Sequence, residues 1–246
     1  MASGEQKSLR SSTIDRLPAS HGPDFHPRAM KPGLIFDLDG TLIDSLPGIA
    51  ASLNRALERC GLSSHAHEDV RRFIGNGSYE LARKAMPEGS LPDDILAVES
   101  AFKDDYALTW AEGTVPYDGI HECLDTLATE GFKLAVLSNK PHPFTVEIVQ
   151  RIFPRVPFDP VFGQRPETPR KPDPEAALQI ARFWGLAPER CRFIGDSTVD
   201  LETARGAGMP AVMVGWGYHD APALLAAGAK SMVEKVRDLD VIFAAS

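Results

Sequence analysis

The chain has 246 residues, an ordinary proportion of hydrophobic side chains and a formal net charge of −8 at pH 7. This length allows one large domain or a core domain with a smaller one, and the negative charge argues against a nucleic acid or an anionic membrane as partner, because both would repel the chain. We therefore expect a small-molecule substrate, and no run of apolar residues approaches the ~18 that a membrane span requires.

Residues 1 to 31 contain many Ser, Pro, Arg and His side chains and almost no apolar periodicity. A segment of this composition cannot bury enough apolar surface to offset the entropy of ordering it, so we predict a disordered extension. The segment also lacks the apolar centre of a secretory signal, and it contains acids, which transit peptides avoid. These features favour a cytoplasmic protein.

Residues 34 to 45, LIFDLDGTLIDS, form a short apolar run that ends at two acids. Such a run is typical of a buried strand that delivers its acids at the carboxyl-terminal edge of a sheet, where open α/β proteins place their chemistry. Asp37 and Asp39 leave an extended backbone on the same side. Two like charges this close need a cation, which a divalent metal would supply. A phosphoryl substrate would explain why there are two acids, because one can attack it and the other can protonate it. The alternative is a simple turn at Asp39 and Gly40.

Four helices with no strand between them are expected from residue 47 to residue 113. Pro47 begins the first and Gly61 ends it, a short helix follows around Val70, and the Gly75 to Gly77 triplet separates it from a third. A longer helix from Ile95 to Tyr106 completes the group. We interpret residues 47 to 113 as an all-helical insertion.

After this insertion the chain alternates between strands and helices. Strands are expected near 133–137, 161–162, 191–194, 211–214 and 232, with helices near 120–129, 143–153, 174–185, 199–207 and 239. This order predicts an α/β fold in which residues 32–46 and 114–246 form a Rossmann-like parallel sheet core and residues 47–113 form an inserted all-helical cap domain.

Polar side chains follow two of these later strands. Ser138 and Asn139 come after the strand at 133–137, where a hydroxyl and backbone amides could bind a phosphoryl oxygen, although a Ser-Asn turn is an alternative. Asp196 follows the strand at 191–194 and could converge with Asp37 on one ion, or it could cap a helix. Mg²⁺ suits a site with few carboxylates, a phosphate and several waters.

The string DLDGTLIDS at 37–45 resembles the first signature of the haloacid dehalogenase-type phosphohydrolases. The strings LSN at 137–139, KPDP at 171–174 and GDSTVD at 195–200 follow in the order of that family's pattern. The resemblance spans about residues 34 to 214. It implies a Mg²⁺-dependent phosphomonoesterase, and Asp39 favours phosphate as substrate because relatives that displace halide lack an acid at that place.

The resemblance also implies a role for each of these residues. Asp37 would attack phosphorus to form an aspartyl-phosphate, and Asp39 would protonate the leaving alcohol and later activate water. Lys171 would pair with the phosphoryl group and the nucleophile. The metal ligands would be the Asp37 carboxylate, the Asp39 backbone carbonyl and the Asp196 carboxylate, with Asp200 supporting Lys171 or a metal-bound water.

Within this family the chain is most similar to the phosphoglycolate phosphatase group, because residues 71–86, RRFIGNGSYELARKAM, resemble its glycine-containing cap segment. The resemblance implies 2-phosphoglycolate as substrate, whose carboxylate would need a second anion site. We expect that site at Arg72, at Gly75, Asn76 and Gly77, and at the amino terminus of the helix that follows them. The alternative is a plain joint between helices with solvated arginines.

Several other functions share the same motifs. A phosphosugar mutase, a pyrophosphatase or a nucleotidase would differ in what the cap admits, and a catalytically inactive binding protein is an alternative of another class. The segment 161–171, VFGQRPETPRK, departs from many relatives and bears on the substrate. We expect a monomer or a homodimer.

The chain has three cysteines, and all three lie in apolar surroundings: Cys60, Cys123 and Cys191. We expect them to be core residues of a protein in a reducing compartment.

Overall fold

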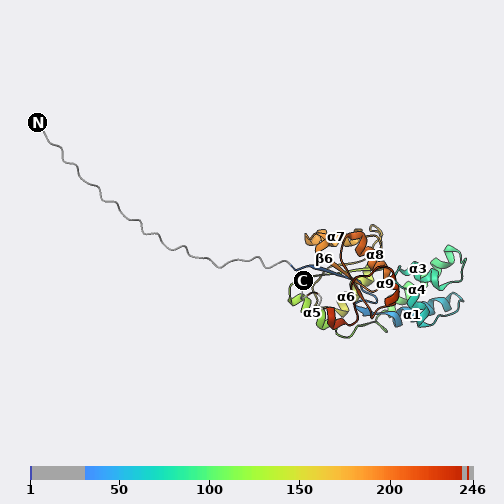
Figure 1. Cartoon of the computed structure of the whole chain (residues 1–246). Helices are drawn as coiled ribbons and strands as arrows, with labels where there is room; N and C mark the ends of the chain where they lie inside the picture. The colour runs from blue at the N-terminus through green and yellow to red at the C-terminus, as the bar shows by residue number, and fades with distance from the viewer. Residues whose placement is uncertain (2–30, 240–242, 244–246) are drawn as a thin grey trace. The chain divides into compact units, whose positions relative to one another are not determined.

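The computed structural model describes residue 1, residues 31–239 and residue 243, so the predicted extension lies almost wholly outside the described residues. Six strands form one parallel sheet in the order β5-β4-β1-β6-β7-β8 (Figure 1). The strands are β1 Gly33–Phe36, β4 Lys133–Pro141, β5 Phe158–Gln164, β6 Cys191–Gly195, β7 Ala211–Val214 and β8 Met232–Val233. This arrangement confirms the predicted α/β fold with a Rossmann-like core.

Strand β1 occupies the centre of the sheet because it pairs with β4 on one side and β6 on the other. Ile35 lies opposite Ala135 in β4 and opposite Phe193 in β6. All three residues are fully buried. A central parallel strand is covered on both faces, which explains why its sequence is a continuous apolar run and not an alternation.

Helices cover the two faces of the sheet, and side chains of β1 alternate between them. Leu34 and Phe36 belong to the apolar core beneath helices α5 and α6, whereas Ile35 belongs to the core beneath α7 and α8. Figure 1 shows these two pairs of helices on opposite sides of the strands. The bounds are α5 Ile120–Thr129, α6 His142–Ile152, α7 Glu175–Trp184, α8 Thr198–Ala207 and α9 Ala221–Ala226, with 3₁₀ turns at Pro188–Arg190 and Val236–Asp238.

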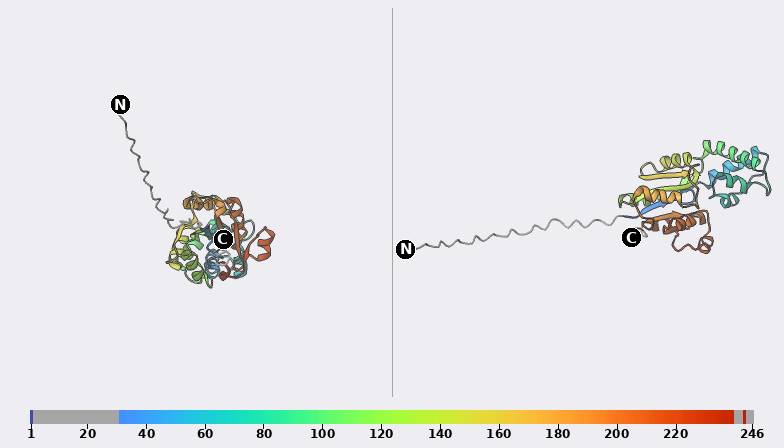
Figure 2. Two further views of the ribbon diagram at one scale, coloured as in Figure 1. Left: turned by 60° about the vertical axis from the view of Figure 1, so that its left-hand side comes forward. Right: turned by 90° about the horizontal axis from the view of Figure 1, so that it is seen from above.

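Four helices follow one another without a strand, as predicted, and we call them the helical segment. They are α1 Leu46–Arg59, α2 His67–Phe73, α3 Ser78–Ala85 and α4 Pro92–Thr109. Helix α4 packs against both α1 and α3, and Figure 2 shows all four gathered at one end of the sheet. None of the helices in the described part of the chain could cross a membrane.

A small ribbon that the sequence did not predict joins the helical segment to the core. Strand β2, Ile43–Asp44, precedes α1 and pairs antiparallel with β3, Val115–Pro116, which follows α4. The sequence suggested linkers there, because two-residue strands are too short to produce an alternating pattern.

Two other expectations were wrong in part. Cys60 is exposed because it follows the last turn of α1, whereas Cys123 and Cys191 are buried as expected. Strand β4 continues to Pro141, so Ser138 and Asn139 lie inside an extended strand and not in a turn. The extension is favoured because a residue before proline avoids helical backbone angles and because Pro141 pairs with Gln164 of β5.

Candidate active site

Polar residues from three adjacent strands meet at the carboxyl-terminal edge of the sheet. Asp37 directly follows β1, Ser138 lies in β4, and Asp196 directly follows β6. All three side chains are buried. Their meeting follows from the strand order, because β1 is the neighbour of both β4 and β6, and such edges are where open α/β sheets bind ligands.

The loop after β1 turns tightly against Asp196. The Leu38 carbonyl accepts hydrogen bonds from the backbone amides of the three residues at positions 41 to 43. Gly40 has a φ of 82°, and a Cβ at this position would collide with the Asp196 carboxylate. Glycine is required here for both reasons. Thr41 then donates its hydroxyl to Asp196 Oδ1 at 3.0 Å, so the loop also orients that acid.

Asp37, Asp196 and Asp200 form a buried acidic group whose ligand atoms lie within 4.8 Å of one another. Burial raises the pKa of Asp37 well above its usual value, despite the opposing charge of Lys171. Burial and the nearby Asp200 raise the pKa of Asp196 to about 7. Lys171 is the cation in contact with these three carboxylates, and a divalent cation would balance their remaining negative charge. Oxygen ligands of this kind fit such an ion.

Lys171 lies between two of these acids. Its Nζ is 2.9 Å from Asp37 Oδ1 and 2.7 Å from Asp200 Oδ1. Burial alone would lower the pKa of the Lys171 ammonium, but Asp200 and Asp37 outweigh that effect and raise it. The lysine therefore stays charged beside Asp37.

Asp200 is held by the start of helix α8. Ser197 is the N-cap residue of that helix, and its backbone N–H and hydroxyl both donate to Asp200 Oδ2, at 3.1 and 2.6 Å. The alternative in which Asp196 caps the helix is therefore wrong. Since Asp200 Oδ1 accepts from Lys171, Asp200 connects the helix cap to the lysine.

Removing divalent metal is expected to lower the melting temperature more at pH 8 than at pH 5.5. In the metal-free protein the pKa of Asp196 is raised from 3.8 to about 7. Between these values the folded state holds a proton that the unfolded state has lost, so metal-free stability falls as the pH rises. A bound cation favours the ionised carboxylate. Saturating Mg²⁺ should raise the melting temperature at pH 8 by about 5 to 10 °C, and clearly less at pH 5.5.

The measurement is a thermal melt with EDTA or with MgCl₂ at the two pH values. Asp196→Asn should lose the Mg²⁺-dependent shift, whereas Asp118→Asn, a change at an exposed turn residue, should retain it. A shift of equal size at both pH values, or one that persists in Asp196→Asn, would contradict a metal site at these acids.

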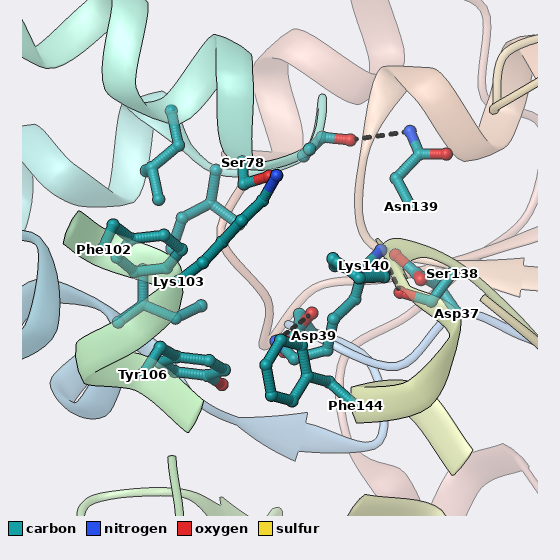
Figure 3. Close-up of a pocket in the computed structure, with 16 residues that line it drawn as sticks. Asp37, Asp39, Ser78, Phe102, Lys103, Tyr106, Ser138, Asn139, Lys140 and Phe144 are labelled. Carbon is teal, nitrogen blue, oxygen red and sulfur yellow. Dashed lines mark hydrogen bonds and ion pairs between the residues drawn. The ribbon is translucent and has the colours of Figure 1, made fainter. Parts of the chain in front are cut away.

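A cavity of about 80 Å³ lies between the core and the helical segment (Figure 3). Its base includes Asp37, Asp39, Ser138 and Asn139, which the structure thus brings together as the sequence predicted. The opposite wall is mainly apolar. The wall residues are Ile49, Ile74, Leu81, Phe102 and Tyr106 from the helical segment and Pro141 and Phe144 from the core.

The glycine-containing loop before α3 reaches this cavity and is attached to the core. Gly75 and Gly77 line the cavity. Asn139 Nδ2 donates to the Gly75 carbonyl at 3.0 Å and to the Lys171 carbonyl at 2.9 Å. The Asn76 carbonyl accepts from Arg170 Nη1 at 2.9 Å. The Asn139 side chain therefore joins the loop to Lys171.

Arg72 does not lie at the cavity, where we expected it to bind the carboxylate of the substrate. Its side chain is 67% exposed, pairs with Glu68 and Asp69 at 3.5 and 3.6 Å, and is not among the residues that line the cavity. Both partners belong to its own helix, α2. The face of a short helix that turns toward a neighbour depends on tertiary packing, which the sequence of α2 does not reveal.

Sequence reasoning missed Lys140, which reaches the base of the cavity. Its Nζ lies 2.9 and 3.0 Å from the two carboxylate oxygens of Asp39, and Asp39 Oδ1 also accepts from the Ser45 hydroxyl at 2.5 Å. The sequence did contain a signal for this position of Lys140. Side chains alternate along a strand, so Lys140 lies on the same side as Ser138 if β4 continues past residue 137. The predicted strand ended too early for that argument.

Comparisons with known proteins agree with this geometry. The model of the haloacid dehalogenase-like hydrolase family matches residues 34–214. The phosphoglycolate phosphatase of Pseudomonas putida is 34% identical over 211 residues, covering 84% of this chain and 77% of the relative. That of Escherichia coli is 32% identical over 227 residues, covering 84% and 90%.

Solved structures show the same fold. A crystal structure from Lactobacillus delbrueckii subsp. bulgaricus superposes with a TM-score of 0.83 at 29% identity, covering 87% of this chain and 98% of that one. A predicted phosphoglycolate phosphatase from Haemophilus somnus gives 0.79 at 26% identity, covering 87% and 99%.

Proposed function

The chain belongs to the haloacid dehalogenase-like hydrolase family and is a phosphatase, and we propose that it hydrolyses 2-phosphoglycolate with Mg²⁺ and through an aspartyl-phosphate intermediate. The observation that carries this proposal is the buried contact of Asp37 with Lys171 beside Asp196, together with the position of Asp37 in the lining of the cavity. A carboxylate, a fixed ammonium and a second carboxylate are what transfer of a phosphoryl group to an aspartate requires.

In this mechanism the Asp37 carboxylate attacks phosphorus and the bond to the ester oxygen breaks. Asp39 gives a proton to that oxygen, so that the alcohol leaves neutral. Water then attacks the aspartyl-phosphate while Asp39 takes its proton, and the products are inorganic phosphate and free Asp37. Asp39 lies at the base of the cavity beside Asp37, which suits a group that serves both halves of the reaction.

Other residues would bind and orient the phosphoryl group. Lys171 neutralises charge beside the nucleophile and Asp200 positions that lysine, while Ser138 and the backbone at Asn139 bind a phosphoryl oxygen. The Asp37 carboxylate, the Asp39 backbone carbonyl and the Asp196 carboxylate would hold Mg²⁺. That ion would supply charge neutralisation on the transferred oxygens.

We propose that residues 47–113 form a cap domain that selects the ester, over a core formed by residues 32–46 and 114–246. The assignment to 2-phosphoglycolate is supported by the relatives that carry this activity in their names. A phosphosugar mutase, pyrophosphatase or nucleotidase would use the same core. An inactive binding protein is disfavoured, because Asp37, Asp39, Lys171 and Asp196 are all present and meet at one place.

The test is a panel of phosphate compounds assayed with Mg²⁺ and with EDTA. We expect 2-phosphoglycolate to have a kcat/KM at least about tenfold above those of hexose phosphates, pyrophosphate and nucleoside monophosphates, and EDTA to abolish hydrolysis of every compound. If another compound has a higher kcat/KM, that compound is the substrate in place of 2-phosphoglycolate. Isomerisation of a sugar phosphate with a bisphosphate activator would indicate a mutase, and the absence of all turnover would contradict phosphatase activity.

A further inference from the structure

Lys140 brings a buried positive charge to the cavity. Its side chain is 6% exposed and its Nζ contacts the Asp39 carboxylate at 2.9 and 3.0 Å. The same Nζ lies 4.8 Å from the centre of the Tyr106 ring, which comes from the helical segment. An ammonium group has three N–H donors, so Asp39 and the ring face do not exhaust its capacity to bind. Figure 3 shows Lys140 reaching from the core toward Asp39, with Tyr106 and Phe144 beside it.

The Tyr106 hydroxyl is a second group that is prepared for a ligand. Tyr106 lines the cavity and is 2% exposed, and its hydroxyl lies close to Lys140 and Thr114 without a well-aligned hydrogen bond to either. A buried hydroxyl whose hydrogen-bonding capacity is not fully used can donate to a ligand. Its placement next to Lys140 gives the cavity a donor pair that belongs to both the core and the helical segment.

The other cations near the cavity are engaged elsewhere. Lys103 also lines it, but its Nζ is 2.7 Å from Glu99 on the same helix and its side chain is 44% exposed. Lys171 is committed to Asp37 and Asp200. Arg72 is exposed and does not line the cavity. Lys140 is also paired, with Asp39, but among the described residues that line this cavity it is the buried lysine, so it is the cation best placed to meet a negative group beyond the phosphate.

We propose that Lys140 and the Tyr106 hydroxyl form the subsite for a second negative group, a carboxylate, on the phosphomonoester substrate. This inference rests on the proposed function, because it assigns the part of the substrate that the phosphate site does not hold. The apolar side chains of Phe102, Phe144 and Leu81 line the same cavity and carry no charge, and attraction between a carboxylate and a buried ammonium is stronger beside apolar groups than in solvent. A neutral ester gains no such contact.

The experiment compares 2-phosphoglycolate with 2-phosphoglycolamide, its uncharged amide, in the wild type and in Lys140→Met. The quantity measured is the ratio of the two kcat/KM values, since any effect through Asp39 or on folding changes both substrates together. The wild type should prefer the acid. Lys140→Met should lower that preference by at least about tenfold, mainly through the KM for the acid. Lys140→Arg, which keeps the charge, should recover part of it.

Two further variants localise the effect. Tyr106→Phe keeps the ring and removes the hydroxyl, and it should lower the preference for the acid by about threefold. Lys103→Met removes the other cavity lysine and should change the ratio by less than about twofold. If Lys103→Met lowers the ratio more than Lys140→Met, the subsite belongs to Lys103 and the proposal is wrong. If Lys140→Met does not fold, Tyr106→Phe and the wild-type preference remain as the test.

Failure of this inference can be distinguished from failure of the proposed function. Absence of hydrolysis of both esters by the wild type would contradict the function. Hydrolysis of both without preference for the acid, or a preference that Lys140→Met and Tyr106→Phe leave intact, would overturn the Lys140 subsite while the phosphatase activity stands.

Discussion

Replacing Asp37 by Asn is expected to abolish ester hydrolysis, with a fall in kcat of at least about 10⁴-fold, because removal of a nucleophile removes the reaction path that depends on it. An amide cannot attack phosphorus, and it brings no negative charge to a metal. The side chain is nearly isosteric, so the hydrogen bond that Leu38 N–H donates to Asp37 Oδ1 at 2.7 Å can be kept. We therefore expect a folded but inactive protein.

Trapping the intermediate gives an independent measurement. Acid quenching of wild-type enzyme during turnover, followed by mass spectrometry, should show a phosphorylated peptide that contains Asp37, and the variant should show none. Asp118→Asn, the same chemical change at an exposed turn, is the matched control and should stay within about twofold of wild-type activity. Substantial hydrolysis by clean Asp37→Asn protein would refute the covalent mechanism.

Replacing Lys171 by Met is expected to damage both stability and activity. Lys171 is 2% exposed and lies between Asp37 and Asp200, and removing one partner of a buried ion pair costs about 3 to 5 kcal/mol because the remaining charge loses its compensation. The variant also loses the ammonium that neutralises the phosphoryl group, so we expect kcat to fall by about 10³-fold.

Both losses can be measured with Mg²⁺ present throughout, by chemical denaturation and by the ester assay. Lys133→Met, at an exposed lysine of β4, is the control and should change the free energy of unfolding by less than about 0.5 kcal/mol. If Lys171→Met unfolds at the same denaturant concentration as the wild type, the ion pairs of Lys171 do not stabilise the fold. If it keeps its activity, the lysine has no part in the reaction.

Features that depend on local patterns were predictable from the sequence. The apolar run before Asp37 and the run before Asp196 identify buried strands, and parallel strands end at the same edge of a sheet, so the meeting of these acids follows from the alternation of strands and helices. The predicted bounds of α5 and β7 agree with those in the structure. Gly131 interrupts the apolar pattern just after α5, and Pro210 interrupts it just before β7.

Features that depend on orientation in three dimensions were not predictable. Arg72 and Lys140 both stand near a motif in the sequence, yet one faces solvent and the other is buried against Asp39. The difference arises from the face that α2 turns outward and from the length of β4, which is extended by pairing with β5. The partner of Lys140 across the cavity, Tyr106, comes from a distant helix, and no local pattern connects the two.

The ribbon of β2 and β3 has a consequence for hybrid enzymes. The chain leaves the core and returns to it at paired residues, Ile43 opposite Pro116 and Asp44 opposite Val115, so the two joints are about 5 Å apart. A graft with ends at this spacing can replace the helices between them without moving any strand of the sheet. Exchange of that segment between relatives would replace the cavity wall that carries Tyr106 and leave Lys140 and the acids of the core in place, which makes the ribbon the natural pair of crossover points for recombination.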